Sequence, residues 1–411
     1  MTALRTLVKD FSLKERALKV IPGGMYGHQN SARLPDGYPQ FMSLGKASRI
    51  WDVDGNEYID LMCSYGPIIL GHSHAKVEEA AMKQQCLADC QNGPSSHMVE
   101  LAEKMTSIVK HGDWVMFAKN GTDATTICIM VARAASKHNK VLIAKGAYHG
   151  ATTWCTPVRI GTTPEDRKNF IEYVFNDLAS VDEALSKEKD GVAAILVSPF
   201  RHDAGYDQEL VDPAFAHGLR NRCDAIGAAL IMDDVRCGFR LHYGSSWEPL
   251  GIQPDLSAWS KAIANGYPLA AVMGKEKFRE DASRLFVTGS FWFSAVAMAA
   301  ACATLEALYK EEAINKMERT GSQLREGLRK QAENYGIKIK QTGPVQMPYI
   351  SFKGDIDYQK INLFCNEAIK KGVYIHPRHN WFLSASLSEA DIDEVLIRTE
   401  FAFQEIDQAF E

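Results

Sequence analysis

Several features that mark particular classes of protein are missing from this sequence. Its nine cysteines include no C-x-x-C pair, and their odd number in a 411-residue chain favours reduced thiols in a cytosol-like compartment. No segment approaches the roughly 20 apolar residues that span a bilayer, and the charged N-terminal stretch has no apolar core of signal-peptide type. The net charge of -5 gives no support for nucleic-acid binding. We therefore expect a cytoplasmic protein that binds neither membranes nor nucleic acid.

Common catalytic motifs are also absent. The chain contains no G-x-G-x-x-G, no H-E-x-x-H and no G-x-S-x-G sequence. Gly66 and Gly71 have the spacing of a P-loop, but His72 follows where a P-loop has lysine. These absences argue against a Rossmann dinucleotide site, a zinc protease, a P-loop nucleotidase and an α/β-hydrolase, and we expect no metal site.

Short apolar strands alternate with helices through the middle of the chain. Stretches such as WVMFA, VLIA, VAAILVS and ALIMDD are separated by helical segments such as DATTICIMVARAASK. Apolar strands without polar alternation are typical of a parallel sheet that is buried on both faces. From about residue 292 the chain becomes helical and then mixed, which indicates a smaller α+β unit. We predict an α/β fold with a mostly parallel sheet between helices and a second, smaller domain.

Two adjacent acids end one of the apolar strands. AALIMDD closes with Asp233 and Asp234, and adjacent residues of a strand point to opposite faces, so only one of them can face a site. A buried carboxylate is costly unless a positive group meets it. The alternative for this pair is a strand-end acid that lies in solvent or caps a backbone amide.

A second strand leads into a helix through Asn120, Gly121 and Thr122, with Asp123 in the first helical turn. Free amides at the start of a helix bind phosphate well, and glycine lets the backbone approach a ligand closely. The alternative is ordinary N-capping of the helix by Thr122.

Lys261 follows the strand LSAWS, and Tyr148 and His149 follow VLIA. In isolation Lys261 reads as a solvated lysine and His149 as a packed or capping histidine. Together with Asp233 and the segment 120–122 they match what pyridoxal phosphate needs. That cofactor needs an amine for a Schiff base, a ring to stack on, an acid that keeps the pyridine nitrogen protonated and a phosphate site. We predict Lys261 and Asp233 as catalytic residues.

Nearly the whole chain resembles a class III, fold-type I pyridoxal-phosphate aminotransferase, and it is most similar to the glutamate-1-semialdehyde aminomutase subgroup. The matching stretches are IPGG at 21–24, RIWDVDGNEYIDLMCSYGPIILGH at 49–72, NGTDAT at 120–125, YHG at 148–150, MDDVRCGFR at 232–240, SKAIANGYPLAA at 260–271 and GVYIHP at 372–377. The resemblance implies a seven-stranded type of sheet, transamination from an amine or amino acid to a carbonyl acceptor, pyridoxal 5'-phosphate as cofactor and a homodimer with shared active sites.

The resemblance also assigns roles to single residues. Lys261 corresponds to the internal-aldimine lysine and Asp233 to the acid that pairs with the pyridine nitrogen. Ser290 occupies the place of a threonine that reaches the phosphate of the partner subunit's cofactor, and Asn120 stands where the family usually has serine. The predicted cofactor-binding residues are Asn120, Gly121, Thr122, Tyr148, His149, Asp233, Lys261 and Ser290.

The resemblance further places three domains: residues 1–60 as an N-terminal arm and part of the small domain, 61–291 as the large cofactor-binding domain and 292–411 as the C-terminal small domain. RIWDVDGNEYIDL, at 49–61, alternates apolar and polar residues around Asp54-Gly55 and predicts a β-hairpin.

The segment between Tyr148 and Asn176 departs from the aminomutase pattern because it is shorter. In the aminomutases this segment forms a lid that retains the diamine intermediate. A shorter lid favours release of a keto product, as in transamination. An aminomutase or an amino-acid racemase with the same cofactor stays open as an alternative. So does a binding protein that has lost its chemistry, although retention of Lys261 and Asp233 argues against it.

Substrate recognition is the least constrained part of the sequence. A substrate carboxylate would favour an arginine fork. Arg378 lies where related β-amino-acid aminotransferases are thought to carry such a residue, so a β- or ω-amino acid is a candidate substrate. Arg201 and Arg33 are further candidates, and Ser64 is a candidate substrate contact. Each arginine has an alternative as a surface or structural residue.

Overall fold

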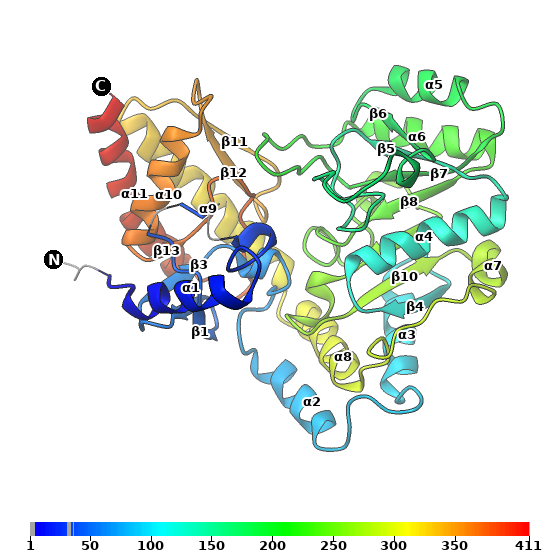
Figure 1. Cartoon of the computed structure of the whole chain (residues 1–411), viewed down its shortest axis with the longest axis horizontal. Helices are drawn as coiled ribbons and strands as arrows, with labels where there is room; N and C mark the ends of the chain where they lie inside the picture. Colours follow the sequence, from blue (N-terminus) through cyan, green and yellow to red (C-terminus); the bar gives the residue numbers. More distant parts are fainter. Residues whose placement is uncertain (1–4, 31–33, 36, 411) are drawn as a thin grey trace. The chain divides into compact units, whose positions relative to one another are not determined.

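The chain folds into two compact units. A computed structural model describes residues 5–30, 34–35 and 37–410 (Figure 1). The first unit comprises the described residues of Met1–His74, Ala204–Asp207 and Asn315–Glu411, and the second comprises Ala75–Asp203 and Gln208–Ile314. The predicted domain boundaries after residues 60 and 291 stay a prediction, whereas the compact units change over at His74 and Ile314.

A seven-stranded sheet forms the centre of the second unit. Its strands are β4 (Trp114–Ala118), β5 (Lys140–Ala144), β6 (Phe170–Tyr173), β7 (Val192–Val197), β8 (Ala229–Asp233), β9 (Leu256–Trp259) and β10 (Ala270–Gly274). They lie in the order β4-β10-β9-β8-β7-β5-β6, and β10 runs antiparallel to both of its neighbours while the other pairs are parallel. The predicted α/β fold with a mostly parallel sheet is confirmed.

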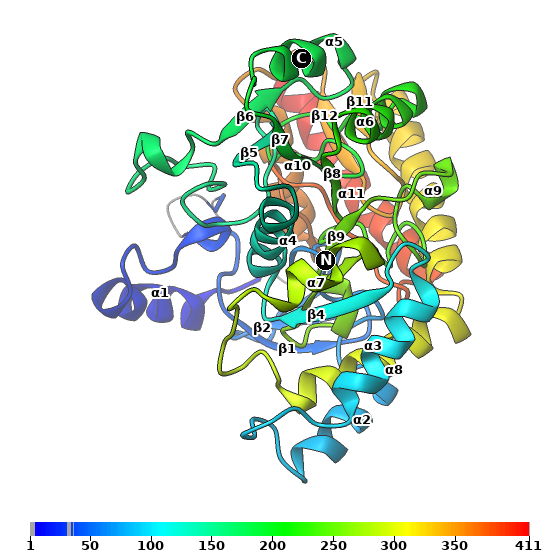
Figure 2. The same cartoon turned by 90° about the vertical axis from the view of Figure 1, so that its right-hand side faces the viewer.

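Helices cover both faces of this sheet (Figures 1 and 2). α4 (Gly121–Ser136) packs on one face, and α5 (Leu178–Ser186) and α6 (Pro213–Ile226) pack on the other. In β8, Ala229 and Ile231 lie in the core beside α4, and Leu230 and Met232 lie in the core beside α6. Because both faces are buried, successive positions of the strand must be apolar, which explains the absence of polar alternation in the sequence.

Three further helices of the second unit pack together. They are α2 (Ala75–Gln85), α3 (His97–Ile108) and α8 (Ala295–Lys310). The short helices of this unit are α7 (Arg279–Ser283), η3 (Pro164–Asp166), η4 (Glu248–Leu250), η5 (Lys261–Ala264) and η6 (Glu276–Phe278). α8 is rich in alanine, and its first turns are buried from Ala295 to Ala301.

The first unit contains two small sheets. The larger has the order β1 (Met42–Lys46), β2 (Arg49–Asp52), β3 (Glu57–Asp60) and β13 (Val373–Tyr374), and β13 is parallel to β3. β11 (Ile339–Thr342) pairs antiparallel with β12 (Tyr349–Phe352). β2 and β3 form the predicted hairpin, and Gly55 in its turn has a φ of 88°.

Helices complete the first unit. They are α1 (Val8–Val20), α9 (Ala313–Asn334), α10 (Gln359–Lys370), α11 (Glu389–Phe410) and the short helices η1 (Gly27–Gln29) and η2 (Cys63–Tyr65). α10 and α11 lie side by side in both views (Figures 1 and 2). This mixture confirms the predicted smaller α+β unit.

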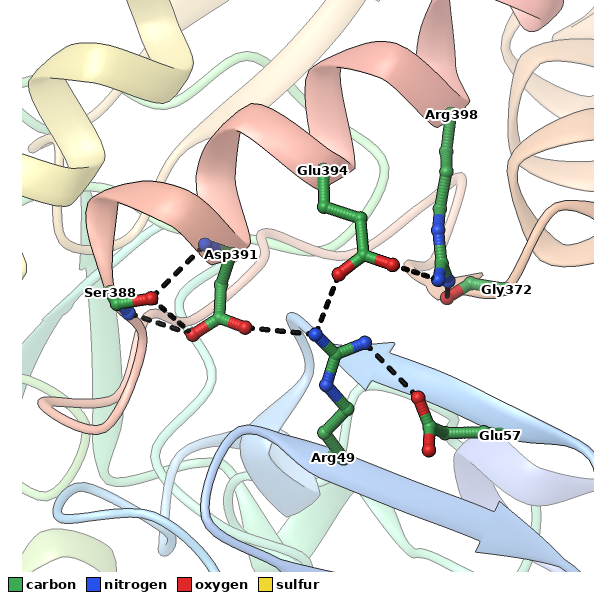
Figure 3. Close-up of polar contacts among 7 residues, drawn as sticks. All are labelled: Arg49, Glu57, Gly372, Ser388, Asp391, Glu394 and Arg398. Carbon is green, nitrogen blue, oxygen red and sulfur yellow. Dashed lines mark hydrogen bonds and ion pairs between the residues drawn. The ribbon is translucent and has the colours of Figure 1, made fainter.

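Arg49 links β2 to α11 through carboxylates (Figure 3). Its Nη2 lies 3.0 Å from Asp391 Oδ1 and 2.6 Å from Glu394 Oε2, and its Nη1 lies 3.1 Å from Glu57 Oε1. Glu394 also pairs with Arg398 one turn later in α11. The positive charge of Arg49 is therefore shared among three acids of the same unit, which ties residues more than 340 positions apart in the sequence.

The start of α11 is held by a reciprocal cap (Figure 3). Ser388 Oγ accepts a hydrogen bond from the Asp391 amide at 3.1 Å, and Asp391 Oδ2 accepts from the Ser388 amide at 2.9 Å and from its hydroxyl at 2.8 Å. This exchange satisfies amides that the helix itself leaves without acceptors. Asp391 thus serves both the cap and the ion pair with Arg49.

Among the described residues, no helix combines the length and the apolar character that are needed to cross a membrane.

Candidate active site

The predicted site residues gather at the carboxyl ends of the strands in the second unit. Asp233 is the last residue of β8, Lys261 comes two residues after the end of β9, and Tyr148 comes four residues after the end of β5. In parallel α/β sheets this edge is where ligands bind. A cavity of about 240 Å³ lies there. The predicted residues that line it are Asn120, Gly121, Thr122, Tyr148, His149, Asp233 and Lys261.

Asn120 caps helix α4 at the wall of this cavity. Its Oδ1 accepts from the Asp123 amide at 3.2 Å, and Asp123 Oδ2 accepts from the Asn120 amide at 3.1 Å. The alternative of N-capping by Thr122 is therefore wrong. A Cβ atom on Gly121 would lie only 2.5 Å from Val235 Cγ1, so any other residue at this position would have to displace Val235. The amides of Gly121 and Thr122 open the helix, where N–H groups have no acceptor within the helix.

Asp233 is oriented by two hydrogen bonds. Its Oδ2 lies 2.6 Å from His149 Nδ1, and its Oδ1 accepts from the Val235 amide at 3.1 Å. Since an ionised carboxylate only accepts, Nδ1 of His149 is the donor of this bond. The ring of His149 is buried, and its Nε2 has no hydrogen-bond partner among the described residues. Asp233 is thus held firmly at the wall of the cavity.

Asp234 points elsewhere, as the geometry of a strand requires. Its Oδ2 accepts from Ser245 Oγ at 3.0 Å, and its Oδ1 accepts from Ser246 Oγ at 2.5 Å. Burial raises the pKa of Asp234 to about 6, although the hydrogen bonds from Ser246 and Ser245 lower it. Asp234 does not line the cavity. The two adjacent acids therefore have separate surroundings, and Asp233 is the one that faces the site.

Lys261 begins η5 in a strained backbone conformation. Its φ is 48°, which is the left-handed region that residues other than glycine adopt at a cost of about 1–3 kcal/mol. Burial lowers the pKa of Lys261 to about 7; the guanidinium of Arg236 lowers it further, and the carboxylate of Asp233 opposes the shift. Near neutral pH a large fraction of this amine is therefore unprotonated and able to act as a nucleophile.

The sequence analysis missed five residues of the cavity wall, which are Gly150, His202, Val235, Arg236 and Ser260. His202 comes five residues after the end of β7, and Arg236 comes three residues after the end of β8. The Arg236 guanidinium donates through Nη1 to the backbone oxygen of His202 at 2.9 Å. The signal that could have found His202 and Arg236 is their position, because β7 and β8 are neighbours and polar residues just after their carboxyl ends reach one edge of the sheet.

Two predicted residues of the second unit are not among the residues that line the cavity. Ser290 is exposed on the loop before α8. Arg201 is half-exposed, and its guanidinium pairs with Asp203 at 3.2 Å and with Glu209 at 3.6 Å. Their predicted contacts, with a partner subunit's cofactor for Ser290 and with substrate for Arg201, stay predictions.

The remaining substrate candidates belong to the first unit. Arg378 is exposed, and its guanidinium lies 4.9 Å from the ring centroid of Tyr358. Ser64 is exposed at a second cavity of about 430 Å³, in a turn whose three residues Cys63, Ser64 and Tyr65 all have positive φ, of 48°, 54° and 62°. Arg33 lies outside the described residues. The roles of these three candidates stay predictions.

The cavity of the second unit fits pyridoxal phosphate by its chemistry. The start of α4 offers amides for a phosphate, Asp233 offers a carboxylate for a pyridine nitrogen, and Lys261 offers an amine for an aldehyde. The aromatic ring of Tyr148 and the side chain of Val235 supply apolar surface for a flat ring. His149 and His202, which line this space, also carry buried ring nitrogens without partners among the described residues.

Comparisons with known proteins agree with this chemistry. Residues 34–396 match the class III aminotransferase family. The aminopentol aminotransferase of Sphingopyxis macrogoltabida is 46% identical over 394 residues, which cover 96% of this chain and 93% of that protein. The 3-aminobutyryl-CoA aminotransferase of Cloacimonas acidaminovorans is 32% identical over 94% of both chains. The glutamate-1-semialdehyde 2,1-aminomutase of Persephonella marina is 30% identical over 97% of this chain and 99% of that protein.

A solved structure extends the similarity to three dimensions. The FumI protein of Sphingopyxis sp. MTA144, in its PLP internal aldimine form, superposes with a TM-score of 0.97 and 45% identity over 98% of this chain and 97% of that chain. The chain therefore belongs to the class III aminotransferases, which are pyridoxal-phosphate-dependent enzymes of fold type I.

Proposed function

We propose that this enzyme transfers an amino group from an amine or amino acid to a carbonyl acceptor in the cavity of the second unit, with Lys261 as the residue that holds the cofactor covalently. The observation that carries this proposal is the common cavity that Lys261, Asp233 and the start of α4 line. When bound there, pyridoxal phosphate supplies an electron-withdrawing ring that stabilises negative charge on the substrate carbon next to the amine.

The chain's own residues then divide the work. Lys261 Nζ moves a proton to and from the substrate carbon, and a pKa of about 7 suits an amine that must both accept and donate a proton near neutral pH. Asp233 keeps a proton on the pyridine nitrogen, and the hydrogen bond from His149 at 2.6 Å holds the carboxylate in place. Asn120, through its cap, fixes the first turn of α4, whose amides bind the phosphate.

We propose a β- or ω-amino acid, or an amine without a nearby carboxylate, as the donor. Two relatives support this choice by their names, because one acts on an aminopentol and the other on 3-aminobutyryl-CoA. Arg378, with Arg201, Arg33 and Ser64 as further candidates, is our proposal for the contact with a substrate carboxylate. If that is right, Arg378→Ala raises KM for amines that carry a carboxylate much more than for simple amines. Equal effects on both groups of donors would remove Arg378 from substrate recognition.

An aminomutase or a racemase remains the second candidate, and the relationship to a glutamate-1-semialdehyde 2,1-aminomutase supports it. The two functions differ in their need for a second substrate. A transaminase stops after one turnover when no carbonyl acceptor is added, whereas an aminomutase or a racemase continues. A screen of amine donors, read as loss of the visible absorbance of the bound cofactor and repeated with and without acceptor, separates them. Continued turnover without acceptor would overturn our proposal.

We also propose a homodimer with shared sites and a cytoplasmic location. Ser290 supports the dimer through its resemblance to a residue that reaches the partner's cofactor, and its exposure leaves it available for such a contact. The nine cysteines are single thiols, which suits a reducing compartment. Analytical ultracentrifugation tests the dimer, and Ser290→Ala should weaken cofactor binding if the phosphate contact exists. A monomer with full activity would refute the shared site.

A further inference from the structure

Three side chains with metal-binding atoms meet where helices α3 and α8 of the second unit pack together. His97 and Glu100 belong to the first turn of α3, and Cys302 belongs to α8. The ring nitrogen, the carboxylate oxygen and the sulfur that they offer all lie within 4.8 Å of one another. The two helices lie side by side in both views (Figures 1 and 2). None of the three residues lines the cavity that holds Lys261, so this cluster is separate from the proposed active site.

The spacing on α3 brings two of these groups to one point. Residues three apart on a helix are neighbours on its surface, and His97 Nδ1 lies 2.9 Å from Glu100 Oε2. In a tetrahedral zinc site with bonds of about 2.0–2.3 Å, the ligand atoms lie about 3.5 Å apart. The side chains of His97 and Glu100 are 29% and 52% exposed, so both can rotate to adjust their distances to the sulfur. The cluster is therefore compact enough to close around one ion.

Cys302 lies where α8 reaches the surface. The residues before it in the helix, from Ala295 to Ala301, are buried, whereas Cys302 is only partly buried. The helix fixes the backbone of this residue, and its thiol is open to an ion from solvent. A thiolate is a soft ligand, and together with an imidazole it favours zinc over calcium or magnesium.

One positive side chain lies close to the cluster. Lys104, one turn after Glu100 in α3, interacts electrostatically with the thiol of Cys302. Its ammonium lies 3.8 Å from Glu306 Oε2, and Glu306 follows Cys302 by one turn of α8. Glu306 thereby offsets part of a charge that would repel a cation.

We propose that His97, Glu100 and Cys302 bind one zinc ion, with a water molecule in the fourth position. When the bond between zinc and sulfur forms, the thiol releases its proton to solvent. This inference goes beyond the proposed function and does not depend on it. The expectation of no metal site rested on missing local motifs, and Cys302 is too distant in the sequence to form such a motif with His97.

The ion would join α3 and α8 beyond a contact that already anchors the start of α8. There, Asp89 Oδ1 accepts from Ser294 Oγ at 2.6 Å and from the Val296 amide at 3.1 Å. Asp89 belongs to the segment that leads into α3, and Cys302 lies about two turns further along α8. We therefore expect zinc to stabilise this packing and to take no part in amino transfer.

The alternative is an ordinary surface pair of His97 and Glu100 beside a cysteine that only packs. Such a group would bind zinc no better than scattered surface histidines and thiols do. Cys302→Ser keeps the size of the side chain but replaces the soft ligand. Cys86→Ser is the matched control, because it removes an exposed thiol that is not part of the cluster.

The first measurement is zinc affinity. The holoenzyme, freed of metal by dialysis against a chelator, is titrated with zinc chloride in a calorimeter, and bound zinc is counted by mass spectrometry. We expect one zinc ion per chain in wild type and in Cys86→Ser. His97→Gln and Glu100→Gln should each raise the Kd by at least about 10-fold, and Cys302→Ser should raise it most. A wild type that binds no zinc, or a Cys302→Ser variant that binds it equally tightly, would overturn the proposal.

The second measurement identifies the ligand atoms. X-ray absorption at the zinc edge should show one sulfur at about 2.3 Å and nitrogen and oxygen atoms at about 2.0–2.2 Å, and the sulfur should be missing in Cys302→Ser. A wild-type spectrum without sulfur would mean that zinc binds elsewhere, which would also overturn the proposal.

The third measurement is thermal unfolding with increasing zinc. The midpoint should rise in wild type and stay constant in Cys302→Ser, because only a bound ion shifts the equilibrium towards the folded state. Equal rises in both enzymes would contradict the site. If Cys302→Ser does not fold, as judged by circular dichroism, Cys302→Ala takes its place in all three measurements.

Discussion

The ion pairs around Arg49 in the first unit and the cavity of the second unit differ in how far the chain itself satisfies their polar groups. Around Arg49 the guanidinium meets three carboxylates of the same unit, and Asp391 also completes a helix cap (Figure 3). At the cavity, His149 Nε2 and both ring nitrogens of His202 have no partner among the described residues, although both rings are buried. The polar groups around Arg49 are thus satisfied within the chain, whereas the ring nitrogens of these two histidines are not.

The largest expected effect is at Lys261. Lys261→Ala removes the only amine among the residues that line the cavity, as far as the described chain shows, and should lower amino transfer by more than about 10³-fold. The visible absorbance of the bound cofactor should change as well. The control is Lys277→Ala, because Lys277 is an exposed lysine that pairs with Asp255, and its activity should stay at the wild-type level. Activity in Lys261→Ala above one tenth of wild type would contradict the assignment.

The adjacent acids give the second test. Asp233→Asn keeps the shape of the side chain but removes its charge, and turnover should fall by about 100-fold or more because the protonated ring nitrogen loses its partner. Asp234→Asn makes the same substitution at the adjacent residue, whose carboxylate accepts hydrogen bonds from Ser245 and Ser246. The turnover of this variant should stay within about threefold of wild type. Equal losses of turnover in Asp233→Asn and Asp234→Asn would contradict the assignment of Asp233 as the acid that acts in the site.

His111 sharpens the contrast with His202, because it is a buried histidine that the chain satisfies. Its Nε2 lies 2.7 Å from Ser257 Oγ, and burial followed by the charge of Lys275 lowers its pKa to about 3. The unfolded chain takes up this proton near pH 6.5 and the folded protein does not. The free energy of unfolding should therefore fall by about 1 kcal/mol per unit as the pH drops from about 6.5 towards 3.

Urea unfolding at several pH values measures that slope. His111→Gln should flatten it, whereas His217→Gln, at an exposed position of α6, should leave it unchanged. A slope that is identical in wild type and His111→Gln would mean that other groups control the acid sensitivity.

The smallest expected effect is at Arg49, although it is the most direct test of a purely structural role. Arg49→Ala should lower the free energy of unfolding by about 1–2 kcal/mol, because a network of ion pairs contributes more than a single exposed pair. Arg329→Ala removes exposed pairs with Glu326 and Glu333 within α9, and it should leave the free energy of unfolding almost unchanged because water screens exposed ion pairs. Turnover should stay near wild type in both, and a large loss of turnover in Arg49→Ala would break the contrast between the two regions.

Much of this arrangement could be predicted from the sequence, because it depends on local patterns. The apolar strands identified the sheet, and the residues that follow them, such as Lys261, Asp233 and Asn120, lie on one cavity. The hairpin at 49–61 was predictable because Asp54-Gly55 supplies a tight turn between alternating strands. The gathering of the site residues needs only the knowledge that parallel strands end at the same edge of the sheet.

The rest depends on which way side chains point and on distant contacts. Arg201 and His202 are adjacent, and the sequence does not show that His202 faces the cavity while Arg201 pairs with Asp203. The capping of α4 by Asn120 rather than Thr122 is a matter of one residue, which patterns do not resolve. The pairing of Arg49 with Glu394 joins segments 345 residues apart and has no local signal.

The most direct test of the central claim is to find the lysine that carries the cofactor. The purified enzyme is loaded with pyridoxal phosphate, reduced with borohydride and digested, and the modified peptide is identified by mass spectrometry. We predict one phosphopyridoxyl group, on Lys261, and none in the Lys261→Ala variant. Modification of a different lysine in active enzyme would contradict the account.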